Sequence, residues 1–187
     1  MNRYLPLVLI VGLLIAFRMV GSAFPESLPN FQPLLALFFC GALLAPGWRG
    51  FAIPFGIWAV TFPLGFGHTA NPLDFLTTGL AIVGTFFLGK SLSKRGIPTL
   101  LLGSAAAALA FHFITCSGAW LTDPRYAKTL TGLTQSLWTG APGDVLPSWV
   151  FLRNLTVANV LFTGIFAVAQ LRMPKPTTAV SDPVFAK

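Results

Sequence analysis

Long apolar stretches, nearly free of charged residues, constrain this chain more than any other feature. Six of them can be marked, at residues 5–20, 33–46, 51–66, 73–88, 98–120 and 148–171. A helix needs about 20 mostly apolar residues to cross a hydrocarbon core of about 30 Å. Only 9% of the residues are charged, against about 25% in a soluble domain. We therefore expect an all-α membrane protein with six transmembrane helices.

The same stretches also predict where the membrane-spanning domain begins and ends. The stretch 33–46 would rise only about 21 Å as a helix, so we expect it to be tilted, extended or placed in a thinned region of the bilayer. The first stretch resembles a signal peptide, but Arg18 within it and the second stretch soon after it favour a retained span. Residues 1–172 would form one six-span domain, and residues 173–187 a short, disordered cytoplasmic tail.

The few charged residues predict the orientation. With both termini in the cytoplasm, eight of the 12 basic residues fall in cytoplasmic segments, as the positive-inside rule requires. These eight are Arg3, Arg49, Lys90, Lys94, Arg95, Arg172, Lys175 and Lys187. The net charge of +7 is thus an orientation signal, and we expect a multi-pass protein of the bacterial inner membrane that has no nucleic-acid partner.

Catalysis is not expected. The apolar stretches hold no Asp, Glu or Lys at mid-depth, whereas proton-coupled carriers and intramembrane hydrolases generally need an ionisable group there. No paired carboxylates, Ser/His/Asp set, HExxH motif or phosphate-binding loop can be assembled. The sequence predicts neither an enzyme nor a bound cofactor. Without a phosphate-binding loop the chain is not expected to hydrolyse ATP itself.

The predicted outer loop 122–147 is long, and residues 126–138 within it have helical character. Leu130, Leu133 and Leu137 recur there at spacings of three and four. We expect an amphipathic helix at the outer mouth of the bundle. It could be a lid over a binding site or a helix that only covers the bundle.

Aromatic, amide and cationic side chains gather near the predicted outer ends of the spans. Such a set suits a pocket for a small, partly polar organic molecule. An alternative is that the aromatic residues anchor the chain at the interface and that Arg153 reaches toward headgroups. The candidate solute contacts are Asn30, Phe31, Trp120, Tyr126, Trp138, Arg153, Asn154 and Asn159.

A second constellation, His112 and Cys116, lies on the fifth stretch. Residues four apart share a helix face, so an imidazole and a thiol could both reach one soft metal or a metal-bearing cofactor. Zinc sites use three or four ligands. The alternative is a hydrogen-bonded histidine beside a cysteine that packs as a small apolar residue.

Small residues recur every four positions on several stretches, where helices could approach closely. Thr77, Ala81, Thr85 and Gly89 form such a face on the fourth stretch. Most faces of this kind pack helices within one chain. Gly12 and Ala16 on the first stretch are the candidate contact for a partner subunit.

Several runs of the sequence resemble a family of uncharacterised bacterial membrane proteins described as transport proteins. The runs are residues 28–38, 113–121, 126–133, 151–154 and 161–163, and the resemblance covers about residues 17 to 168. That family is similar in size, span count and loop layout to the S components of energy-coupling-factor (ECF) transporters, which capture vitamins or metal ions. The resemblance implies an S-component-like bundle with a pocket under the outer loops.

Together these patterns predict an integral membrane protein that binds or transports a small, vitamin-like organic solute. Its expected partners are the lipid bilayer, the solute and an ATPase or energy-coupling module. Two alternatives stay open. One is a non-transporting membrane scaffold or assembly protein, and the other is a metal or corrinoid binder that uses His112 and Cys116.

Overall fold

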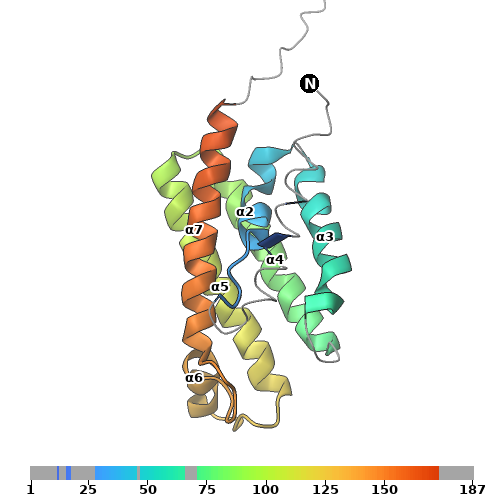
Figure 1. The fold of residues 1–187 in the computed structure, drawn as a ribbon, viewed down its shortest axis with the longest axis vertical. Coiled ribbons are helices and arrows are strands. Elements are labelled where there is room, and N and C mark those ends of the chain that lie inside the picture. The colour runs from blue at the N-terminus through green and yellow to red at the C-terminus, as the bar shows by residue number, and fades with distance from the viewer. Residues whose placement is uncertain (1–11, 13–15, 18–27, 46, 66–70, 173–187) are drawn as a thin grey trace, which may run out of the picture.

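The computed structural model describes residues 12, 16–17, 28–45, 47–65 and 71–172. All regular structure in these residues is helical (Figure 1). The predicted first span lies mostly, and the predicted tail 173–187 wholly, outside the described residues. The helices are α2 (Leu34–Leu44), α3 (Arg49–Gly65), α4 (Pro72–Leu92), α5 (Ile97–Thr122), α6 (Leu130–Trp138) and α7 (Ser148–Arg172).

Three of these helices are long and apolar enough to cross a membrane: α4, α5 and α7 over Ser148–Leu171. The expectation of an all-helical membrane protein is confirmed to that extent. Helix α2 has 11 residues and rises only about 16 Å, about half of a hydrocarbon core. Six spans and their orientation stay predictions.

Local capping explains where two helices begin. Helix α4 starts at Pro72, whose missing N–H costs nothing in a first turn, and the Asn71 side chain accepts a hydrogen bond from the Leu73 amide at 3.0 Å. Helix α6 starts at Leu130, four residues after the predicted start at residue 126. That predicted boundary is wrong because Thr129 supplies the N-cap.

The helices alternate in direction, so the bundle has two distinct ends (Figure 1). One end carries the turns between α2 and α3 and between α4 and α5, together with the end of α7. We call it the basic end because it exposes Arg49, Lys90, Lys94 and Arg95. The opposite end, where α5 ends, α6 lies and α7 begins, is the α6 end.

Helix α2 lies at the centre of the bundle. Every residue from Leu34 to Gly41 is buried, and α2 contacts α3, α4 and α7. Because neighbours surround it, α2 is apolar on all its faces. Its Phe38, Phe39 and Cys40 are fully buried members of the core.

Glycines allow the closest approaches between helices. A Cβ on Gly89 of α4 would overlap the backbone of Phe39 in α2, and a Cβ on Gly41 of α2 would overlap the carbonyl of Gly50 in α3. Gly89 belongs to the small-residue face predicted on the fourth stretch, and Ala81 and Thr85 of that face are buried as well. This face therefore packs helices within the chain.

Candidate ligand site at the α6 end

Helix α6 is a nine-residue helix that lies at the end of the bundle beside α5 and α7 (Figure 1). The Thr129 hydroxyl accepts a hydrogen bond from the Gly132 amide at 3.2 Å and caps its first turn. Its buried positions are Gly132, which lies against the Ala127 carbonyl, and Ser136. Leu130 is 80% exposed. The buried face of α6 is thus made of small residues, and the first leucine of the predicted apolar stripe points away from it.

His112 of α5 fastens α6 to the bundle. Its Nε2 lies 2.9 Å from the carbonyl oxygen of Leu137, and because a carbonyl only accepts, Nε2 carries the proton and donates it. The Cys116 sulfur lies 3.7 Å from Nδ1 and 3.6 Å from Nε2. Nδ1 is therefore the ring nitrogen whose lone pair is left for another partner.

A metal at this pair would find few ligands. The described residues contain no group of three or more His, Cys, Asp and Glu side chains that could hold a metal ion. Nδ1 of His112 and the sulfur of Cys116 could offer two ligands of the soft type. The metal site stays a prediction, while the His112 hydrogen bond is an observed structural role for the ring.

Arg125 joins the two loops that flank α6. Its guanidinium pairs with Asp123 at 2.6 Å and with Asp144 at 2.7 Å. Asp144 also accepts a hydrogen bond from the Ala141 amide at 2.9 Å. The side-chain hydrogen bond from Arg125 is the main reason why the pKa of Asp123 is lowered from its ordinary value. These ion pairs hold the loop after α5 against the loop before α7.

Trp120 lies in the last turn of α5, and Tyr126 lies in the loop that follows it. The Trp120 indole donates a hydrogen bond to the Ala127 carbonyl at 2.8 Å, and the Lys128 ammonium donates to the carbonyl oxygen of Trp120. Tyr126 is buried, and burial raises the pKa of its hydroxyl to about 12. The indole N–H of Trp120 is therefore already used within the protein.

An exposed row of three side chains lies where α6 ends and α7 begins. It consists of Trp138, Trp149 and Arg153, and we call it the Trp–Trp–Arg row. The ring centroids of Trp138 and Trp149 are 6.4 Å apart, with planes inclined by 31°. The guanidinium carbon of Arg153 lies 5.3 Å from the Trp149 centroid, a cation–π distance. Arg125 has two carboxylate partners, whereas Arg153 has none among the described residues.

Asn154 ties this row to the segment that precedes α2. Its Nδ2 donates to the Pro29 carbonyl at 3.1 Å, and its Oδ1 accepts from Nε of Arg153 at 3.2 Å. Asn30 follows Pro29 with a φ of 58° and is exposed, a left-handed conformation that Asn tolerates better than most residues. The Asn154 amide thus positions both the Arg153 side chain and the turn that carries Asn30.

Two predicted site residues lie deeper in the bundle. Phe31 turns toward the core, where its ring centroid lies 6.2 Å from that of Phe162. Asn159 is fully buried, and its Nδ2 donates to the Ser104 carbonyl at 2.6 Å. The Oδ1 of Asn159 and the hydroxyl of Thr163, one turn further along α7, have no hydrogen-bond partner among the residues that the structure describes.

The structure therefore divides the eight predicted solute contacts into three groups. In or beside the Trp–Trp–Arg row lie Trp138, Arg153, Asn154 and Asn30; where α5 ends and the following loop begins lie Trp120 and Tyr126; in the bundle lie Phe31 and Asn159. Asn159 lies about 9 Å further along α7 than Arg153, so the prediction combined residues at different depths. It omitted Trp149, although the spacing of four between Trp149 and Arg153 indicates a shared helix face.

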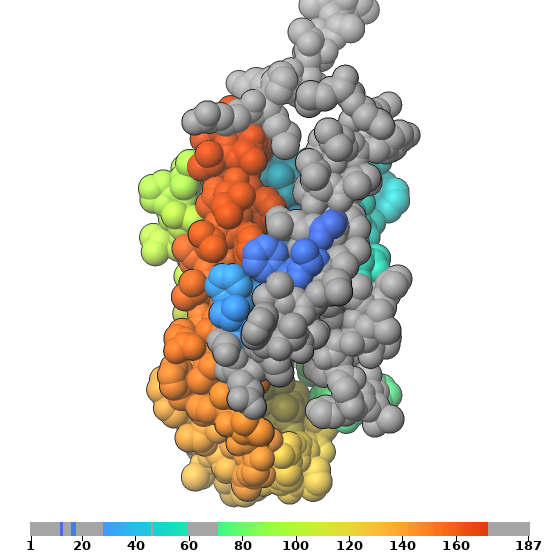
Figure 2. Space-filling view, in the orientation of Figure 1, coloured from blue at the N-terminus to red at the C-terminus, as the bar shows by residue number. Residues whose placement is uncertain are grey.

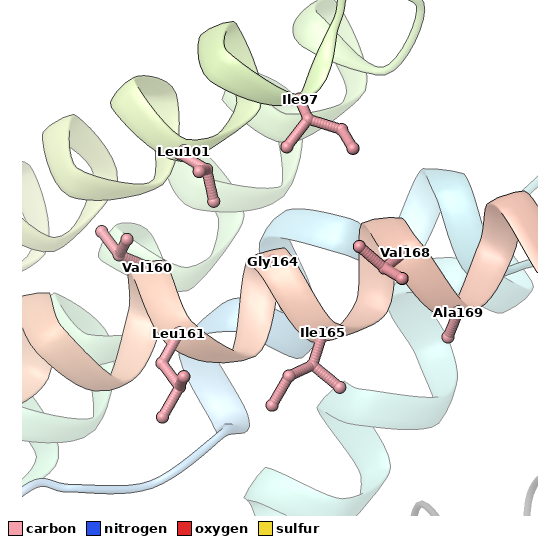
Figure 3. Close-up of a pocket in the computed structure, with 8 residues that line it drawn as sticks. All are labelled: Ile97, Leu101, Val160, Leu161, Gly164, Ile165, Val168 and Ala169. Atoms are coloured by element: carbon pink, nitrogen blue, oxygen red, sulfur yellow. The ribbon is translucent and has the colours of Figure 1, made fainter.

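A hollow of about 660 Å³ lies between α5 and α7 (Figure 3). None of the predicted solute contacts lines it. Its lining is entirely apolar and consists of Ile97, Leu101, Val160, Leu161, Gly164, Ile165, Val168 and Ala169. This hollow and the Trp–Trp–Arg row are therefore separate features of the bundle.

Comparison with known proteins gives a family without an assigned activity. A profile described as "Family of unknown function (DUF6580)" matches residues 1–179. No curated protein and no solved structure matches the chain. Since the match covers nearly the whole sequence, the chain belongs to the family of unknown function DUF6580.

Proposed function

We propose that this chain is a multi-pass protein of the bacterial inner membrane that binds a small, partly polar organic solute at its α6 end. It has six spans, with both termini in the cytoplasm, and works as the S components of ECF transporters do, by capturing a vitamin-like molecule. It binds its solute without chemically changing it.

The distribution of charge supports this orientation. The described part of the basic end exposes four cations and contains no carboxylate. The α6 end is balanced, with Arg125, Lys128 and Arg153 against Asp74, Asp123 and Asp144. Basic residues concentrate on the cytoplasmic side of membrane proteins, so the basic end faces the cytoplasm and the α6 end faces outward.

The observation that carries the proposal is the position of Arg153 in the Trp–Trp–Arg row. A guanidinium without a carboxylate partner among the described residues can bind a carboxylate or phosphate through two parallel hydrogen bonds. The neighbouring indoles of Trp138 and Trp149 offer faces on which a planar ring can stack. Together they suit a planar organic anion.

The test begins with the full-length protein purified in neutral detergent, screened by thermal shift against planar organic carboxylates of the vitamin type. Arg153→Gln should lower the affinity for a compound that binds by about tenfold or more, because a charge-assisted hydrogen bond is lost. Arg49→Gln removes the same charge from an exposed arginine at the basic end and should have no effect. Equal affinity of the wild type and Arg153→Gln would reject this site.

An ATPase or energy-coupling module would be the partner for transport. It would approach the basic end and the small-residue face formed by Gly12 and Ala16. Both residues are exposed, and a Cβ on Gly12 would meet no atom within 4 Å, so a partner helix could approach closely there. Replacement of Gly12 by Leu should then reduce solute uptake in proteoliposomes that contain the module, with solute binding unchanged.

A further inference from the structure

The hollow between α5 and α7, which we call the α5–α7 groove, is open toward the surface of the helix bundle. Leu161, Ile165 and Val168 of its lining are each about half exposed, at 48%, 49% and 47%. Figure 3 shows Ile97 and Leu101 of α5 opposite the side chains of α7. Gly164 leaves room between the helices, since a Cβ there would lie 3.6 Å from Leu101.

The groove is suited to a hydrocarbon chain. Its volume of about 660 Å³ lies within the range of about 300–1,000 Å³ found for ligand pockets. Its lining side chains offer no hydrogen-bonding group, so a polar occupant would lose its hydrogen bonds with water without compensation.

One end of the groove lies beside two cations. Ile97 is both the first residue of α5 and part of the lining, and Lys94 and Arg95 lie three and two residues before it in the turn from α4. Both are exposed, and neither pairs with a described carboxylate. Figure 2 shows the yellow-green surface of this turn bordering the C-terminal half of α7.

We propose that the α5–α7 groove binds an anionic phospholipid, with an acyl chain between the helices and the headgroup phosphate at Lys94 and Arg95. An apolar furrow that ends beside two cations without a carboxylate partner in the described part of the chain is complementary to such an amphiphile in both shape and charge. Basic sites next to transmembrane helices bind anionic headgroups by this electrostatic attraction. The site is independent of the solute site, which lies at the opposite end of the bundle.

The headgroup is tested by native mass spectrometry of the full-length protein in neutral detergent. Phosphatidylglycerol should bind more tightly than phosphatidylcholine with the same acyl chains. Lys94→Gln/Arg95→Gln should weaken phosphatidylglycerol binding by about fivefold for each charge removed and abolish the preference. Arg49→Gln is the control, because it removes an exposed cation of the basic end on α3, which is not part of the groove.

The acyl site is tested by filling the groove. Gly164→Phe should weaken the binding of both lipids. Gly84→Phe makes the same change at an exposed position of α4, where a Cβ would meet no atom within 4 Å, and should leave lipid binding unchanged. Arg153→Gln, at the solute site, should also leave the lipid preference intact.

Two results would overturn the proposal. One is equal retention of the two lipids by the wild type, which needs no variant and so does not depend on a variant's folding. The other is a dimer that Gly164→Phe disrupts while the number of bound lipids stays the same, because the groove would then hold a second copy of the chain.

Discussion

At the scale of single residues, the two buried asparagines of α7 show how the position of the acceptor carbonyl gives one residue type two different roles. Asn154 donates to the Pro29 carbonyl, which lies in a turn, and Asn159 donates to the Ser104 carbonyl, which lies inside α5. A carbonyl within a helix also accepts from the backbone amide four residues later. The turn carbonyl therefore depends more on its asparagine than the helical one does.

Asn154→Ala should accordingly lower the free energy of unfolding by about 1–3 kcal/mol, the cost of leaving a buried carbonyl unpaired. Asn159→Leu should cost less, because it also removes a buried Oδ1 that has no hydrogen-bond partner within the described ranges. Denaturant titration in detergent, followed by tryptophan fluorescence, measures both. A larger loss for Asn159→Leu would contradict this comparison.

At the scale of secondary structure elements, glycine positions decide how closely helices pack. Gly89 of α4 touches the backbone of α2, whereas the Cβ position of Gly84, on the same helix, is open. Gly89→Ala should lower the free energy of unfolding by about 1–3 kcal/mol, because the two helices must move apart. Thermal unfolding in detergent should show this loss.

Gly84→Ala provides the matched control for Gly89→Ala. It should keep or slightly raise the unfolding temperature, since alanine favours the helix more than glycine does. Similar unfolding temperatures for the two variants would show that α2 and α4 do not pack as closely as the structure has them.

The loops beside α6 should respond to acid. The folded state lowers the pKa of Asp123, mainly through Arg125. The ion pair therefore contributes stability above the ordinary carboxyl pKa of about 4, and this contribution is lost as the pH falls through the lowered pKa. The effect should be small because the pair is exposed.

The measurement is the unfolding temperature between about pH 7 and pH 3. The unfolding temperature of the wild type should fall further on acidification than that of Arg125→Gln, which lacks the ion pair at every pH. Parallel pH profiles for the two proteins would show that Arg125 does not stabilise the loops through the charge of Asp123.

At the scale of the whole molecule, the difference in charge between the two ends predicts the topology. Lys94→Cys and Val145→Cys place thiols at the basic end and the α6 end, at positions that are both exposed. The natural cysteines would first be removed by Cys40→Ala and Cys116→Ser. In intact cells an impermeant maleimide should label only Val145→Cys, and Lys94→Cys should react after permeabilisation. The opposite pattern would reverse the proposed orientation.

The length and apolar character of the individual helices could be read from the sequence alone. Length and hydropathy set the three long apolar helices α4, α5 and α7, because each property belongs to one continuous stretch. The shortness of α2 was predicted for the same reason. The start of α6 was placed four residues too early, at residue 126, although the Thr129 cap lies directly before Leu130, the first leucine of the pattern.

The contacts between side chains on different helices became known only from the folded structure. Asn154 and Pro29 are 125 residues apart in the chain, and His112 and Leu137 are 25 apart. The long helices are apolar around their whole circumference, so hydrophobic periodicity does not reveal which face packs inward. On α4 it was the spacing of small residues that marked the packed face. The rotation of each helix and the choice of its neighbours also decided where the α5–α7 groove lies. These contacts follow from packing across the whole bundle, which no single stretch of sequence specifies.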